Sequence, residues 1–163
     1  MYDHCAHKRM GARPKRSHDS NQTLSCYWEV NGTRAHCLKE SGCEGIMISP
    51  DFTCAMGIVT KKLENPMALQ LACVGSKLTI SYGATSTIAF WNQHIEEYFD
   101  VANIDYYDVI LGTRFLRRLR ITLDFASPGN IRIGTYTVPR NLPSAQVEGN
   151  MAALLQPHPK FPE

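Results

Sequence analysis

The sequence predicts an all-β fold, and three observations support this prediction. Segments rich in strand-forming residues recur along the chain, and turn signals separate them roughly every ten residues, as in a sheet or barrel. Asn31-Gly32 lies between two such segments and suits a type I′ hairpin turn, in which both central residues need positive φ. Helical signals are confined to two short stretches, which begin near Ser49 and Thr113.

The composition is that of a folded domain with tails. The 163 residues are 44% hydrophobic and 20% charged, and the net charge of +2 is too small to indicate nucleic-acid binding by the whole chain. No run approaches the ~18 apolar residues of a membrane span, and no signal-peptide core is present, so we expect an intracellular protein without membrane contact. The six cysteines include no Cys-x-x-Cys pair. We therefore expect free thiols and predict neither a metal nor a cofactor.

The folded domain is expected over residues 23–138, between two disordered tails. Residues 1–22 are basic and poor in apolar side chains, so they cannot bury enough surface to become ordered. We expect a solvated linker there, with weak RNA contact as the alternative. His4, Cys5 and His7 form too weak a pattern to predict a metal site. Residues 139–163 are rich in prolines and small residues and form the second predicted tail.

The first half of the domain begins with a predicted hairpin over residues 23–39. A short apolar strand follows at 46–48. Ser49 is then a helix N-cap, Pro50 suits the first helical position, and Gly57 ends the short helix. The strands predicted after this helix are 58–63, 67–73, 78–82, 85–90 and 98–104, with residues 64–66 as an interruption and 74–77 as a turn.

The second half of the domain begins with a predicted buried strand over residues 106–112. Phe115, Leu116 and Leu119 then have helical spacing, which predicts a helix over 113–119 with Thr113 as its cap. Alternation of apolar and polar residues predicts a strand at 121–125. The turn 127–130 leads into a last strand at 131–133.

Two motifs carry the functional prediction. Glu40-Ser41-Gly42 follows an apolar-leaning strand, and residues 108–116 (DVILGTRFL) lie about seventy positions later. With the glycine-containing segment 71–77 between them, these motifs resemble the retropepsin-like aspartic proteases of gypsy-type retrotransposons. The resemblance covers residues 23–138. It implies a closed β-barrel with one or two short helices.

The resemblance also implies roles for individual residues. Glu40 takes the place of the catalytic aspartate, Ser41 that of a hydroxyl residue that bridges the dimer, and Gly42 that of a close-approach glycine. The segment Val74-Gly75-Ser76 takes the place of the flap tip, which would contact the substrate. Gly112 lies on the strand behind the site. The implied active unit is a homodimer that cuts its element's own Gag–Pol polyprotein, in the cytoplasm or in virus-like particles.

Several residues depart from the family pattern. Glu40 is one methylene longer than aspartate, and Lys39 stands where an apolar residue is expected. A Lys39 ammonium close to Glu40 would favour the ionised carboxylate, the wrong state for half of an acid pair. Arg114 and Arg120 stand where small residues are usual, and Arg120 would need the positive φ of a glycine C-cap. Trp91 replaces a natural turn glycine.

Three functional interpretations remain open. The chain is an endopeptidase domain impaired or inactivated by Glu40, a working enzyme that tolerates glutamate, or a non-catalytic dimerisation or peptide-binding module that keeps the fold. Other acidic residues have simpler explanations than catalysis. Asp105 and Asp108 would make a replacement acid pair, but Asp108 is better explained as a residue that orients backbone. Glu96 and Glu97 are expected on a solvated face, and Cys43 is expected as a small buried residue.

Overall fold

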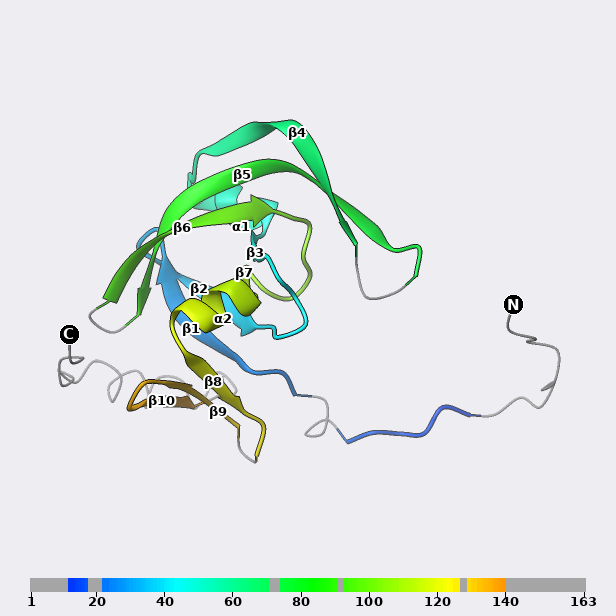
Figure 1. Cartoon of the computed structure of the whole chain (residues 1–163), viewed down its shortest axis with the longest axis vertical. Coiled ribbons are helices and arrows are strands. Elements are labelled where there is room, and N and C mark those ends of the chain that lie inside the picture. Colours follow the sequence, from blue (N-terminus) through cyan, green and yellow to red (C-terminus); the bar gives the residue numbers. More distant parts are fainter. Residues whose placement is uncertain (1–11, 18–21, 71–73, 91–92, 127–128, 140–163) are drawn as a thin grey trace.

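The computed structural model describes residues 12–17, 22–70, 74–90, 93–126 and 129–139 (Figure 1). Its elements in chain order are β1 Ser25–Val30, β2 Thr33–Lys39, β3 Ile46–Ile48, α1 Pro50–Ala55, β4 Thr60–Gln70, β5 Lys77–Phe90, β6 Gln93–Val101, β7 Val109–Leu111, α2 Thr113–Arg118, β8 Ile121–Asp124, β9 Asn130–Ile133 and β10 Tyr136–Pro139. The predicted tails 1–22 and 139–163 lie mostly outside the described residues. No helix in the described ranges is long and apolar enough to span a membrane.

The strands form a closed barrel and a small second sheet. In the described part of the chain, the larger sheet has the order β1-β2-β7-β3-β6-β5-β4. Pairing of Glu29 with Ala89 and of Val30 with Ile88 joins β1 to β5, which closes six strands into a barrel and leaves β4 outside the ring. Strands β8, β9 and β10 form the second sheet, which Figure 1 shows beside the barrel. The predicted all-β barrel with short helices is confirmed.

The main core fills the barrel and reaches α2. Trp28 on β1 stacks on Phe90 with ring centroids 4.4 Å apart, and its ring lies 6.1 Å from that of Phe115 on α2. Val30, Ile88 and Phe115 are fully buried in the same cluster. Burial of these side chains ties the first hairpin, the long strand β5 and the second helix into one unit.

The first hairpin and the first helix form as the sequence predicts. Asn31 (φ 54°) and Gly32 (φ 73°) take the positive φ values of the predicted turn. The Ser49 hydroxyl accepts a hydrogen bond of 3.3 Å from Phe52 N and caps α1. Gly57 (φ 64°) follows the helix and turns the chain toward β4.

Two pairs of predicted strands are continuous in the structure, so those predictions are wrong. Residues 60–70 form the single strand β4, whose register shifts between Lys62 and Met67 and so accommodates Pro66, which has no N–H to donate. Residues 77–90 form the single strand β5, with Gly83 at its middle. A Cβ on Gly83 would clash with the ring and hydroxyl of Tyr98, so this glycine serves close packing and makes no turn.

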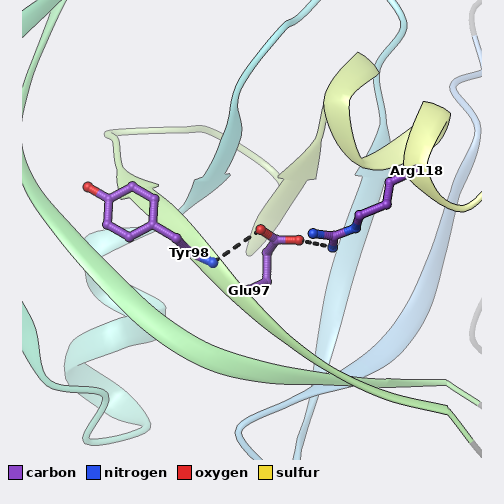
Figure 2. A network of polar contacts seen from close by, with 3 residues as sticks. All are labelled: Glu97, Tyr98 and Arg118. Carbon is purple, nitrogen blue, oxygen red and sulfur yellow. Dashed lines mark hydrogen bonds and ion pairs between the residues drawn. The ribbon is translucent and has the colours of Figure 1, made fainter.

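Strand β6 begins five residues earlier than the predicted strand 98–104. It includes Glu97 and places its side chain in the protein interior. Glu97 is buried, whereas Glu96 is exposed. The predicted exposure to solvent is therefore correct for Glu96 and wrong for Glu97. The Glu97 carboxylate accepts a charge-assisted hydrogen bond from Arg118 on α2, and its other oxygen accepts one of 3.1 Å from Tyr98 N (Figure 2). Residues alternate along a strand, and position 97 shares the core-facing side with Phe99.

Replacing Arg118 should destabilise the domain. Arg118→Met leaves the buried Glu97 carboxylate without its cation, and we expect a loss of about 1–3 kcal/mol in the free energy of unfolding, since Arg118 itself is partly exposed. Urea unfolding measures this loss. The control is Arg117→Met, which removes an exposed arginine from the same helix. Adding Glu97→Gln to Arg118→Met should recover part of the lost stability. Equal urea midpoints for Arg118→Met and the unmodified chain would contradict a stabilising role of the Glu97–Arg118 pair.

The region around α2 departs from the prediction in its details. Strand β7 covers only Val109–Leu111, and Tyr106, inside the predicted strand, has a φ of 66° that is incompatible with extended chain. The N-cap of α2 is Gly112 and makes no side-chain cap hydrogen bond, so Thr113 is not the cap. Arg120 takes the left-handed conformation (φ 51°) expected at its position. Strand β10, which pairs with β9, is not predicted from the sequence.

Candidate active site

The candidate site lies where three strands meet. Strand β7 runs between β2 and β3, parallel to β2 and antiparallel to β3. The Glu40-Ser41-Gly42 turn follows β2 directly, and Gly112 follows β7 directly. Glu40 N donates to the Leu111 carbonyl at 3.1 Å, and Gly112 N donates to the Gly45 carbonyl at 3.0 Å. Two motifs about seventy residues apart in sequence are therefore joined by backbone hydrogen bonds.

Gly112 allows this junction to form. A Cβ at this position would clash with the carbonyl oxygens of Gly45 and Cys43 and would lie 3.0 Å from the Cys43 carbonyl carbon. These atoms belong to backbone and cannot rotate away. Thr113 N also donates to the Cys43 carbonyl at 2.7 Å, which fixes the loop after the turn against the start of α2. Gly112 was predicted on the strand itself, but it directly follows β7 and is the N-cap of α2.

The Glu40 carboxylate folds back onto its own turn. Its Oε1 accepts a hydrogen bond of 2.9 Å from Gly42 N. Glu40 is half-buried, while Ser41 and Gly42 are exposed. A Cβ on Gly42 would lie 3.1 Å from the same oxygen, so the glycine leaves room for this contact. The longer glutamate side chain reaches an amide two residues ahead and caps the turn.

Lys39 is the last residue of β2, and no ion pair within the described residues joins it to Glu40. The Lys39 side chain is buried in the core, with Nζ 2.8 Å from Cys26 Sγ and 3.2 Å from the Cys37 carbonyl oxygen. Nζ also lies 3.7 Å from the centroid of the Trp28 ring, a cation–π contact. Burial raises the pKa of the Cys26 thiol, and the neighbouring lysine lowers it in part. The core therefore holds a cation whose described partners include no carboxylate.

Replacing this buried cation should stabilise the domain. For Lys39→Met we expect a gain of ~1–4 kcal/mol in the free energy of unfolding, because burying a charge without a counter-charge costs free energy and methionine fills the same space. Chemical denaturation with urea measures the gain. The control is Lys62→Met at an exposed position of β4, which should change stability by less than about 0.5 kcal/mol. A clear loss of stability in Lys39→Met would show that the ammonium is a net stabilising group.

The hairpin of β4 and β5 stands where a flap is predicted. Figure 1 shows it arching above the barrel and extending beyond it. The turn at its tip contains Val74, which is fully exposed, and Gly75, whose φ is 80°. The Ser76 carbonyl accepts a hydrogen bond of 3.0 Å from Gln70 Nε2 within the hairpin. In the described residues, no hydrogen bond of this tip reaches the Glu40 turn, and residues 71–73 lie outside the description.

A second apolar cluster lies between the hairpin and the sheet, and the sequence gives no direct signal for it. Its buried members are Met47, Ile80 and Ala102, and its half-buried members are Cys43, Leu63, Leu69, Leu78, Ile104 and Ile110. We refer to these nine residues as the hairpin cluster. Ile110 belongs to it, whereas its neighbours Val109 and Leu111 face the main core, because successive strand residues point to opposite faces. The hairpin cluster therefore connects both hairpin arms with the loop after the Glu40 turn.

The remaining sequence candidates have structural roles. Asp108 accepts a hydrogen bond of 2.7 Å from His36 N and so orients backbone, as predicted, and Asp105 is exposed. Cys43 is half-buried, and burial raises its pKa, which argues against a reactive thiol. Burial also raises the pKa of Cys37 to about 12. Arg114 is exposed, and Trp91 lies outside the described residues.

Comparison with solved structures identifies the fold. The retroviral protease-like domain of Ddi1 from Leishmania major is 17% identical, and the match covers 74% of this chain and 94% of that domain with a TM-score of 0.55. EIAV protease in complex with the inhibitor HBY-793 is 18% identical, with coverage of 67% and 99% and a TM-score of 0.52. No protein-family model and no curated protein matches this chain. The chain has a retropepsin-like fold, and at this level of identity the likeness shows the fold alone.

Proposed function

We propose that this chain is a retropepsin-like aspartic endopeptidase domain of a gypsy-type retroelement polyprotein, and that Glu40 impairs its activity. One observation carries the proposal. The Glu40 carboxylate lies at the end of β2, on a turn that backbone hydrogen bonds tie to β7, and it is bound by Gly42 N. The fold and the position of this acid support the protease assignment, and the extra methylene of glutamate supports its impairment.

The chemistry requires two copies of this turn. In a homodimer with a two-fold axis, each copy would supply one carboxylate, and two carboxylates so close together share one proton. The ionised member takes a proton from water, and the protonated member gives one to the peptide carbonyl. Ser41 would hold the two turns together. The hairpin tip Val74-Gly75-Ser76 would close over the peptide and exclude water.

Glutamate fits this arrangement poorly. Each extra methylene moves a carboxylate by about 1.5 Å in a space that suits acids ~3 Å apart, and a misplacement of about 1 Å can cost ~10²-fold in rate. In the described turn, Oε1 of this longer side chain accepts a hydrogen bond from Gly42 N.

The proposed partners follow from the same assignment. The substrate is a peptide segment of the element's Gag–Pol polyprotein, and the site of action is the cytoplasm or a virus-like particle. In the described part of the basic tail, Arg13, Lys15 and Arg16 are exposed, which suits weak RNA contact through phosphate attraction.

Cleavage by the unmodified chain tests the impairment. With a Gag-derived peptide at about pH 5, where one acid of such a pair is protonated, we expect little or no pepstatin-sensitive cleavage. Rapid pepstatin-sensitive cleavage would show instead that the site tolerates glutamate.

The same Glu40 geometry supports a second candidate, a non-catalytic module for dimerisation or peptide binding. The Glu40–Gly42 contact completes the turn without any partner carboxylate, so the fold does not need the chemistry. The mass in solution and peptide binding test this candidate. A dimer that binds the peptide without cutting it would support the candidate, and a monomer would contradict both dimer-dependent functions.

A further inference from the structure

Asp100, which lies beside the candidate site, has no ion-pair partner among the residues that the structure describes. In β6 it is in register with Met47 on β3 and with Gly83 on β5. Phe99 and Val101 on either side of it face the main core, so Asp100 faces the other side of the sheet, which carries Met47 and Ile110 of the hairpin cluster.

Gly45 leaves space beside the half-buried Asp100 carboxylate. The side chain of Tyr98 fills the space over Gly83 on β5, whereas a Cβ on Gly45 would lie 3.6 Å from Asp100 Oδ2. Gly45 comes three residues after Gly42, so the Asp100 carboxylate borders the loop that leaves the candidate active-site turn. A peptide held between the hairpin and this turn would pass within reach of Asp100.

No cation in the described residues neutralises Asp100. The ion pair found among the described residues joins Arg118 to Glu97, whose side chain lies on the other face of β6. Lys61 faces the same side as Asp100 but lies beyond Gly83, and no ion pair joins the two. Burial raises the pKa of Asp100, without any compensating positive charge.

We propose that Asp100 determines specificity by receiving a lysine or arginine side chain of the bound peptide. This inference rests on the proposed peptide-binding function and names its substrate class. The half-buried Ile110 on the same face would provide apolar surface for the methylene stem of such a side chain, while its charged end would reach the carboxylate. Arginine suits the site best, because its guanidinium can donate two parallel hydrogen bonds to one carboxylate.

Peptide binding tests this proposal without requiring catalysis. Arginine is placed at each position in turn of an otherwise apolar, fluorescently labelled peptide, with norleucine at the same position as the matched control. Binding is measured by anisotropy with the unmodified chain and with Glu40→Asp. We expect one position at which arginine binds about 10-fold more tightly than norleucine. Asp100→Asn should remove that preference and leave the norleucine peptide unaffected.

The control variant is Glu96→Gln, which removes an exposed carboxylate from the same face of β6 and should leave the preference intact. If peptides bind but arginine gives no advantage, or if Asp100→Asn keeps it, the specificity proposal is wrong and the peptide-binding function stands. If no peptide binds either chain, the proposed function fails, and the specificity proposal fails with it. Unchanged binding of the norleucine peptide to Asp100→Asn shows that the variant is folded.

Discussion

Gly112→Ala should prevent the domain from folding stably. The added Cβ would clash with the backbone of Gly45 and Cys43, and neither carbonyl can move without breaking the hydrogen bonds that join the loop to β7 and α2. Overpacking against fixed backbone should cost at least ~3 kcal/mol, a large part of the stability of a small domain. Thermal unfolding followed by circular dichroism measures the effect, and we expect a strongly lowered midpoint or no cooperative transition.

The matched control for this variant is Gly45→Ala in the same loop. A Cβ there would have nearest neighbours at 3.5–4.0 Å, all of them side-chain atoms, which is ordinary van der Waals contact. We therefore expect Gly45→Ala to fold. Equal midpoints for the two variants would show that the close approach at Gly112 does not hold the site together.

Local sequence signals predicted the local structure well. The Asn31-Gly32 turn and the cap at Ser49 each depend on residues within four positions of one another, so the sequence is sufficient to place them. Arg120 is an instructive case. Its position required a left-handed residue, and the chain takes that conformation even though an arginine occupies the place of a glycine.

Long-range contacts account for most of the errors. Glu97 looks like a surface acid by its polarity, and only the fold brings Arg118 to it, from twenty-one positions away. Gly83 looks like a turn residue, but the ring of Tyr98 on the next strand occupies its space. The lengths of β5 and β6 therefore could not be predicted from the sequence of either strand alone.

The direction of the Lys39 side chain was within reach of sequence reasoning. Alternation along β2 places Ala35, Cys37 and Lys39 on one face, and the small apolar residues mark that face as the core. The same rule applied to residues 109–111 indicates that Ile110 faces away from the main core, although it does not reveal the hairpin cluster. The flap role of Val74, Gly75 and Ser76, like the catalytic role of Glu40, stays a prediction.

The most direct test of the central claim compares Glu40→Asp with the unmodified chain. Aspartate is one methylene shorter, which should let two carboxylates meet across a dimer axis and share a proton. The control is Glu44→Asp, the same chemical change at an exposed position of the adjoining loop.

The quantity to measure is kcat/KM for pepstatin-sensitive cleavage of a Gag-derived peptide. We expect Glu40→Asp to exceed the unmodified chain by at least ~10²-fold, and Glu44→Asp to match the unmodified chain. Equal rates for Glu40→Asp and the unmodified chain would contradict the account. If both were active, the extra methylene would be harmless, and if both were silent in a folded dimer, Glu40 would not be the residue that prevents catalysis.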